Sequence, residues 1–206
     1  MTRRREQVSQ TDTPSATSQW VISTRELGRR PGNMRTYQRT IPAPSEFSLG
    51  VIGIPEDSPI ELDVRLESAS EGVFVSGSAS GALVGECSRC LEPIADTVTV
   101  GLGELFAYPN SVTEATTDAD EISRIVDDLI DTRPMVRDAV LLALPLAPLC
   151  REDCRGLCPN CGERWADLEP GHGHDTMDTR WAALGGWLDR ASDTDVDAAA
   201  DADERR

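Results

Sequence analysis

The sequence predicts an α+β fold, in which an antiparallel β-sheet with cysteine knuckles packs against a few short helices. Three observations lead to this class. Apolar and charged residues alternate with a period of two in the first half of the chain, as in half-buried strands. One amphipathic helix pattern follows, and six cysteines stand in pairs on both sides of that helix.

The strand pattern is clearest from Ile60 to Glu67, where every apolar residue is followed by a charged one. Further strands are predicted at residues 72–75, at residues 83–87 and from residue 97 toward 108. Cys87 and Cys90 fall between the last two strands, where a hairpin must turn. The sheet is therefore expected to carry a two-cysteine knuckle at one end.

A core helix is predicted between Thr132 and Pro145. Asp131 or Thr132 can cap it, Pro134 suits its first turn, and Pro145 ends it. Its expected apolar face consists of Val136, Ala139, Val140, Ala143 and Leu144. The helix then leads the chain to Cys150. A second short helix is expected to begin at Asp178, with an apolar stripe of Trp181, Leu184 and Leu188.

Charge is unevenly distributed along the chain. The formal net charge is −16, but residues 1–40 carry eight arginines against three acidic residues, a net of +5, which leaves −21 for residues 41–206. The candidate RNA-contacting residues are Arg25, Arg29, Arg30, Arg35 and Arg39. Guanidinium groups suit phosphate, yet the same residues could form a solvated linker that pairs with the acidic body. Both interpretations are open at this point.

The sequence contains no segment suited to a membrane. Its first residues are basic but reach no apolar stretch, so no secretory signal is expected. The longest apolar run, residues 139–149, is interrupted by two prolines and is too short to span a bilayer. These features predict a cytoplasmic protein without a membrane partner. In that reducing compartment, paired cysteines are expected to bind metal rather than to form disulfides.

Eight side chains are candidate metal ligands. They are the six cysteines and the two histidines of the chain: Cys87, Cys90, Cys150, Cys154, Cys158, Cys161, His172 and His174. Structural zinc takes four ligands, so the sequence predicts one or two structural zinc ions. Saturated sites leave no coordination position for water or a small-molecule substrate, which favours a structural role for the metal.

Two groupings of these ligands are possible. In the first, Cys150, Cys154, Cys158 and Cys161 form one local site, and the other four residues are left over. In the second, Cys87 and Cys90 join Cys150 and Cys154, while Cys158 and Cys161 join the histidines. The second is preferred, because a knuckle normally takes its other ligand pair from a separate segment and because no ligand pair is left over.

Two chemical alternatives are weaker. A redox C-x-x-C pair normally sits at a helix amino terminus, whereas Cys87 and Cys90 lie between strands. A magnesium-dependent nuclease would need Asp127, Asp128 and Asp131 to converge on one site, and nothing in the sequence indicates that they do.

The expected organisation is a single zinc-stabilised α+β domain over residues 19–188, between a polar disordered tail at 1–18 and an acidic disordered tail at 189–206. Within the domain, residues 38–108 are predicted to be rich in β-structure, residues 109–121 to form an acidic loop, and residues 122–188 to hold the helix and the knuckle region.

Four ordered motifs resemble the YceD family of bacteria and plastids, from about Trp20 to Leu188. They are Leu27-Gly28-Arg29-Arg30-Pro31-Gly32, Cys87-Ser88-Arg89-Cys90-Leu91, Leu144-Pro145-Leu146, and Cys150-x3-Cys154-x-Gly156-Leu157-Cys158-x2-Cys161-Gly162. Some relatives end the second site with C-x-C, where this chain has His172-Gly173-His174.

The resemblance implies a ribosome biogenesis factor that supports synthesis, processing or stability of large-subunit (23S) ribosomal RNA. It brings no catalytic residue, so no enzymatic activity is expected. Genes of this family often lie beside that of a small basic large-subunit ribosomal protein, so the expected partners are ribosomal RNA, a basic large-subunit ribosomal protein, or both. The alternatives are a zinc-dependent adaptor or regulator unrelated to ribosomes, and the metal-dependent nuclease.

Overall fold

The computed structural model describes residues 18–118, 121–174, 180 and 184. Contacts divide the chain into two units, one ending at Gly156 and the other beginning at Leu157, and each is described by itself. Of the predicted amino-terminal tail only Ser18 lies within the described residues. The acidic tail at 189–206 lies outside them, as do Trp181 and Leu188 of the helix predicted near the carboxyl end.

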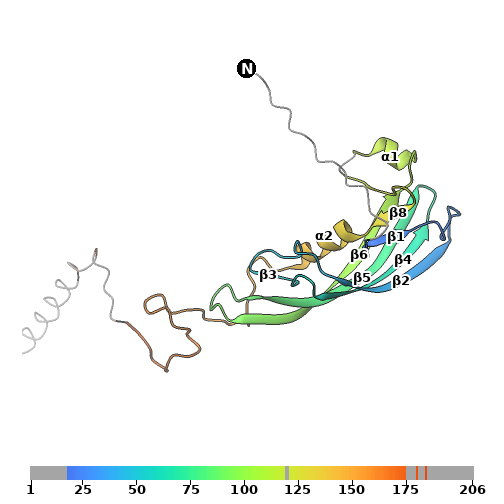
Figure 1. The fold of residues 1–206 in the computed structure, drawn as a ribbon. Coiled ribbons are helices and arrows are strands. Elements are labelled where there is room, and N and C mark those ends of the chain that lie inside the picture. The colour runs from blue at the N-terminus through green and yellow to red at the C-terminus, as the bar shows by residue number, and fades with distance from the viewer. Residues whose placement is uncertain (1–17, 119–120, 175–179, 181–183, 185–206) are drawn as a thin grey trace, which may run out of the picture. The chain divides into compact units, whose positions relative to one another are not determined.

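The first unit is built on a six-stranded sheet with the order β2-β4-β5-β6-β7, to which β3 adds by pairing with β5 (Figure 1). Its strands are β2 (Met34–Pro42), β3 (Ile52–Gly53), β4 (Pro59–Ser68), β5 (Gly72–Glu86), β6 (Pro93–Ala107) and β7 (Ser123–Arg124). Neighbouring strands are antiparallel except β6 and β7. The predicted class, mostly antiparallel β-structure with a few short helices, is confirmed in this respect.

The inner face of the sheet forms the core. In β4, the apolar residues of the alternating pattern are all buried, and Ile60, Val64 and Leu66 have no exposed surface. Each apolar position of β4 pairs with a small or apolar residue of β5, as Leu66 does with Val75. Because paired residues of antiparallel strands point to the same face, the period of two places a continuous apolar layer on one side.

The strand that follows β4 differs from the prediction. Residues 72–86 form one continuous strand, β5, where two strands at 72–75 and 83–87 are predicted from the sequence. The intervening residues are small and look like a loop, but they lie in the ladder between β4 and β6. At Gly77, a Cβ atom would overlap the carbonyl oxygen of Asp63 in β4. Small residues here therefore permit close strand approach.

The basic segment is also more ordered than the sequence indicates, because residues 34–42 form edge strand β2. Arg35, Tyr37 and Arg39 pair with apolar residues of β4 and so lie on the inner face. Both faces of β2 carry polar residues, which is why no hydrophobic period marks it as a strand. Arg35 and Arg39 thus belong to the sheet and not to a linker.

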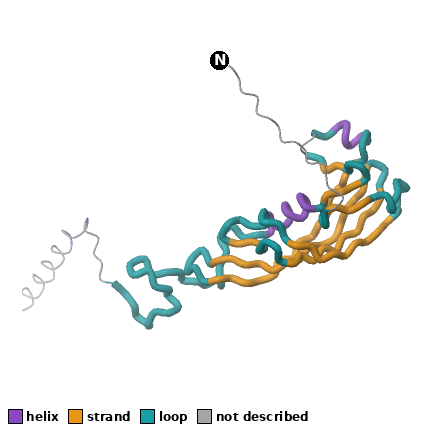
Figure 2. Tube along the Cα trace, in the orientation of Figure 1, coloured by secondary structure: helices purple, strands orange, loops and turns teal. Residues whose placement is uncertain are grey.

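One helix covers the inner face of the sheet. Helix α2 (Arg133–Ala143) begins after Thr132 with a proline in its first turn, as predicted, and packs mainly against β6 (Figure 2). Its buried residues are Met135, Val136 and Val140, followed by buried Leu144, whereas Ala143 is exposed, contrary to the expected apolar face. Among the described residues, no helix is long and apolar enough to cross a membrane.

Small elements complete the first unit. Strands β1 (Val21–Ser23) and β8 (Leu129–Asp131) form a separate antiparallel pair. Helix α1 (Val112–Thr116) lies within the predicted acidic loop, where the Ser111 hydroxyl accepts a hydrogen bond from the Glu114 amide. Trp20, next to β1, packs edge-on against Phe47 with ring centroids 5.6 Å apart, so the chain entering the sheet is anchored in the core.

Candidate metal centres

The first group of candidate ligands lies at the tip of the β5–β6 hairpin. Cys87 follows β5 directly, and Cys90 lies in the turn that leads to β6. The turn is held by the Cys87 amide, which donates to the Glu92 carbonyl, and by the Leu91 amide, which donates to the Cys87 carbonyl. This tight turn directs both thiols toward the segment that follows α2.

The segment after α2 brings the other two thiols to the same place. Leu144 and Pro145 end the helix, and the Ser88 amide then donates a 2.8 Å hydrogen bond to the Pro148 carbonyl. The Arg89 guanidinium donates at 2.8 Å to the Cys154 carbonyl. These two hydrogen bonds therefore join the hairpin tip to the segment after α2 without any contribution from the sulfur atoms.

The sulfur geometry fits a tetrahedral ion. The Sγ atoms of Cys87 and Cys154 are 3.8 Å apart, and those of Cys90 and Cys150 are 3.6 Å apart. All four ligand atoms of this group lie within 4.8 Å of one another. Zinc–sulfur bonds of about 2.3 Å in a tetrahedron place neighbouring sulfurs roughly 3.8 Å apart. The residues present thus match what a four-thiolate zinc site requires.

The thiol pKa values diverge within this group. Burial alone would raise the pKa of Cys87, but backbone hydrogen bonds, with that of Cys150 the strongest, lower it to about 6. Burial and the neighbouring thiols raise the pKa of Cys150 to about 12, and burial with Cys154 and Cys87 also raises that of Cys90. Four thiolates so close repel one another, and a divalent cation is the chemistry that compensates them.

The second group lies entirely in the second unit. A bridge between Leu157 and Arg164 frames a turn in which the Cys158 amide donates to the Glu163 carbonyl and the Gly162 amide to the Cys158 carbonyl. Gly162 has a φ of +77°, a conformation that suits glycine. The turn directs Cys158 and Cys161 to the same side, as a metal knuckle does.

The histidines complete this group. The Sγ atom of Cys161 lies 3.6 Å from Nε2 of His172, and the four ligand atoms lie within 4.8 Å of one another. Zinc bonds of about 2.3 Å to sulfur and about 2.05 Å to nitrogen give a separation of roughly 3.6 Å in a tetrahedron. The rings of His172 and His174 are edge to face with centroids 4.5 Å apart, so both imidazoles converge on the knuckle.

The Cys158 thiol has a lowered pKa, which favours the thiolate form that binds metal. The pKa of the Cys158 thiol is lowered to about 6, chiefly by a hydrogen bond from the Cys161 backbone. Burial opposes this shift, and hydrogen bonds from the Asn160 backbone and the His172 side chain add to it. The second group differs from the first in exposure, because Cys161 and His174 are exposed and His172 is half-buried, whereas the first group has three buried thiols. The first group is thus the more enclosed of the two.

The structure thus brings together Cys87, Cys90, Cys150 and Cys154 in one group and Cys158, Cys161, His172 and His174 in the other. This is the second of the two groupings considered from the sequence. In the part of the chain that the structure describes, no other set of histidines, cysteines and carboxylates forms such a group. Each group offers four donors, which fill a tetrahedral zinc ion without a position for substrate.

Acidic groups lie among the five candidate RNA-contacting arginines, and three of the arginines face a carboxylate. Arg25 and Arg29 lie 3.6 and 3.9 Å from the carboxylate of Asp128, and Arg29 also stacks on the Tyr108 ring. Arg35 makes a 2.6 Å ion pair with Glu26.

The other two differ from each other. The Arg39 guanidinium donates to the carbonyls of Gln19 and Val21. The Arg30 side chain has no hydrogen bond or ion pair with any described residue. Most of the predicted basic arm is therefore engaged within the protein.

Two of the three acidic residues considered for a nuclease are likewise paired with arginines. Asp128 faces Arg25 and Arg29, and Asp131 pairs with Arg133 at 3.6 Å. Asp127 is exposed. These three carboxylates do not belong to either group of converging ligands.

Two residues that support the first centre were not singled out for this role by the sequence. Arg89 holds the Cys154 carbonyl, and Gly156 has a φ of +77° with its Cα against the Arg89 backbone, where a Cβ would lie 2.9 Å from the Arg89 carbonyl oxygen. The glycine two positions after Cys154 is the sequence signal for such a close turn.

Comparison with known proteins finds a family model that spans both groups. A family model described as large ribosomal RNA subunit accumulation protein YceD matches residues 75–186. That range holds all eight candidate ligands and begins after the five arginines. No solved structure matches the chain significantly.

Several bacterial proteins are similar over most of their length. An uncharacterized protein of Mycobacterium tuberculosis is 48% identical over 177 residues, which cover 86% of this chain and 85% of that protein. One of Mycobacterium leprae is 44% identical over 164 residues, 80% and 75% of the two chains. The uncharacterized protein YlbN of Bacillus subtilis is 29% identical over 128 residues, 62% and 73% of the two chains.

Proposed function

The chain belongs to the YceD family, and from that premise we propose that it is a non-enzymatic, zinc-stabilised factor that supports accumulation of large-subunit ribosomal RNA by binding a basic large-subunit ribosomal protein. It would act in the cytoplasm, where ribosomal subunits are assembled. The bound protein would be held in a soluble form until it meets the RNA.

The charge distribution carries this proposal. Residues 41–206 have a net charge of −21, and a surface of that sign repels nucleic acid while it attracts basic polypeptides. The exposed face of β4 illustrates it, since Glu61, Asp63 and Glu67 outnumber Arg65 among the outward residues that alternate with the inward apolar ones. A basic ribosomal protein supplies the complementary charge over a wide area.

The arginine contacts favour a protein partner further. Direct RNA binding would need several guanidiniums free for phosphate, yet Arg25, Arg29 and Arg35 face carboxylates of the same chain. Exposed ion pairs contribute little, on the order of 0.2–1 kcal/mol each, so phosphate could displace them. RNA contact through Arg30 and its neighbours is therefore a second mechanism, which could operate beside binding of the protein partner.

The two candidate centres would serve this function by holding the binding surfaces in shape. Zinc, when bound, would supply four strong bonds per centre and neutralise the converging thiolates. Cys87 and Cys90 would hold the end of the β5–β6 hairpin to the segment after α2, and the knuckle with His172 and His174 would order the second unit.

Gene deletion tests the proposal. Cells that lack the protein are expected to accumulate less large-subunit ribosomal RNA, with small-subunit RNA unchanged, and a plasmid copy should restore the level. A copy with Cys87→Ser should fail to restore it, whereas one with Ser88→Ala, an exposed neighbour, should succeed. Normal subunit profiles after deletion would instead favour an adaptor unrelated to ribosomes.

A nuclease role has a separate test. The purified, metal-loaded chain is expected to leave precursor ribosomal RNA intact in the presence of magnesium or manganese. Cleavage that is lost on Asp128→Asn would contradict the non-enzymatic assignment.

A further inference from the structure

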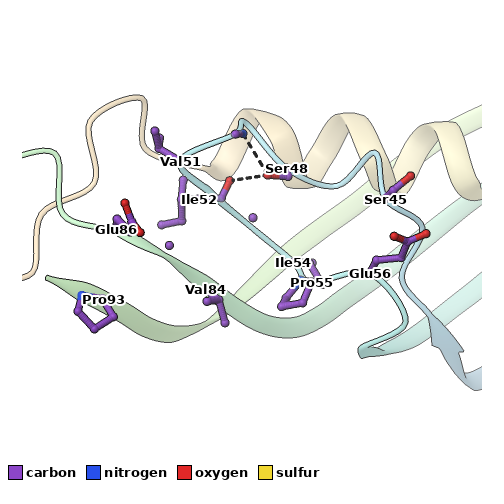
Figure 3. A pocket seen from close by; sticks show the side chains of 13 residues that line it. Ser45, Ser48, Val51, Ile52, Ile54, Pro55, Glu56, Val84, Glu86 and Pro93 are labelled. Atoms are coloured by element: carbon purple, nitrogen blue, oxygen red, sulfur yellow. Dashed lines mark hydrogen bonds between the residues drawn. The ribbon is translucent and has the colours of Figure 1, made fainter. Parts of the chain in front are cut away.

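A groove in the first unit is lined by apolar and acidic residues. It lies between the loop at residues 45–56 and the ends of β5 and β6, and its volume is about 620 Å³ (Figure 3). The loop is held down by the Glu86 amide, which donates to the Val51 carbonyl.

Apolar side chains form the floor of this groove. Val51 and Val84 are 50% and 49% exposed, which is high for valine, and Pro55 and Pro93 are exposed beside them. Val84 belongs to β5 and Val51 to the loop, so two separate segments contribute to one apolar surface. Such a surface gains free energy when aliphatic groups cover it.

The only charged residues in the lining are two carboxylates, Glu56 and Glu86. Both are exposed, and neither side chain has a hydrogen bond or an ion pair with any described residue. In Figure 3 they lie at the two ends of the groove, with the apolar residues between them. No arginine lines the groove, so its charge is not compensated within the described protein.

We infer that this groove is the docking site for a short basic segment of a partner protein, an inference that rests on the proposed function. Arginine and lysine side chains bury their aliphatic stems on apolar surface and keep the charged head free. In the groove, the stems lie on Val51, Val84 and the two prolines, and the heads reach Glu56 and Glu86. The site thus recognises alternating basic and small apolar residues.

Charge excludes the other occupants. Phosphates of RNA would meet two carboxylates and no cation in the lining. A second copy of this chain would bring another strongly negative surface, since residues 41–206 carry −21, and like charges at an interface oppose association. Of these occupants, only a basic peptide can cover the apolar floor with aliphatic groups and pair with the carboxylates at the two ends.

The tip of the hairpin links the groove to the first metal centre. Glu86 precedes Cys87, and Pro93 follows Cys90 by three positions. The ligands that fix the hairpin tip therefore also fix two residues of the groove. Metal removal is expected to weaken peptide binding as well as to loosen the centre.

The test uses the full-length, metal-loaded protein labelled with nitrogen-15 and an acetylated, amidated nonapeptide of alternating arginine and alanine. The amide signals of Gly50, Gly53 and Gly85 are expected to shift to saturation, while Gly101 and Gly103, on the exposed face of β6, stay unchanged. A glutamate–alanine peptide should shift none of them. Unchanged groove signals, or equal shifts with a single-stranded RNA oligonucleotide, would overturn the inference.

Matched variants separate the groove from general attraction. Glu56→Gln with Glu86→Gln is expected to weaken peptide binding roughly fivefold to thirtyfold, which corresponds to about 0.5–1 kcal/mol for each of two exposed ion pairs. Glu121→Gln with Glu169→Gln makes the same change in net charge at exposed positions outside the groove and should stay within about twofold of wild type. Equal weakening in both pairs would show diffuse attraction and contradict the groove.

The groove and the proposed function can fail separately. If the wild-type chain keeps no large-subunit protein after RNA digestion, the protein-partner function fails. If it keeps such a protein, and the Glu56→Gln, Glu86→Gln variant keeps as much as the matched control pair, the function stands and only the groove assignment is wrong.

Discussion

The substitution Cys90→Ser gives the sharpest prediction about the fold. Cys90 and Cys150 are 60 positions apart, and their sulfurs lie 3.6 Å from each other. Cross-linking a loop of that length removes roughly 4 kcal/mol of chain entropy from the unfolded state. A metal that binds both segments has the effect of such a cross-link, so its loss should lower the stability of the first unit by about that amount.

The assay is urea denaturation followed by Trp20 fluorescence. Trp20 is 7% exposed and lies in the first unit, whereas Trp165 lies in the second. Replacing the tryptophans at 165, 181 and 187 by phenylalanine leaves Trp20 as the only reporter. With a slope of about 2 kcal/mol per molar urea, the midpoint of the Cys90→Ser variant should fall by roughly 2 M.

Cys161→Ser is the matched control, because it makes the same chemical change in the second centre. It should remove one metal ion per chain and leave the Trp20 midpoint unchanged, since Cys161 and His172 are only 11 positions apart and lie in the other unit. Equal midpoints for Cys90→Ser and wild type, or equal shifts for the two serine variants, would refute the cross-link argument.

Three further predictions concern metal content and packing. Wild type is expected to bind two zinc ions per chain by plasma mass spectrometry, and Cys87→Ser and Cys158→Ser one each; unchanged metal in Cys87→Ser would restore the local four-cysteine grouping. Gly156→Ala, which places a Cβ 2.9 Å from the Arg89 carbonyl oxygen, should destabilise the protein by about 1–3 kcal/mol more than Gly32→Ala, which lies in the same unit and has a positive φ of +88° but open space, in urea titrations of both. Ile60→Ala, at a position with no exposed surface, should cost about 2–5 kcal/mol in the same titration, and an alanine variant as stable as wild type would show that the sheet packs differently.

Hydrophobic period predicts part of this fold well. The alternation in β4 and the spacing in α2 survive in the structure because one side of each element packs on the core and the other meets water. The same signal fails for β2, whose inward residues Arg35 and Arg39 are long polar side chains at the sheet edge. It fails in β5 as well, where close strand approach selects Gly77 over a larger residue.

The candidate ligands were predictable because coordination chemistry restricts residue types and spacing. Cysteines and histidines in pairs identify the donors, and a count of eight donors favours two centres. The supporting contacts were not predictable, because the hydrogen bond from Arg89 to the Cys154 carbonyl joins positions 65 apart in sequence. The groove was not predictable for the same reason, because Glu56 and Glu86 are placed at its two ends only through the pairing of β3 with β5.

The measurement that tests the central claim most directly is purification of the tagged chain from cells, with and without nuclease, followed by identification of what remains bound. The acidic body, with a net charge of −21, predicts that a basic large-subunit ribosomal protein stays bound after all RNA has been digested, and that high salt releases it. Loss of every ribosomal protein on digestion would contradict the account.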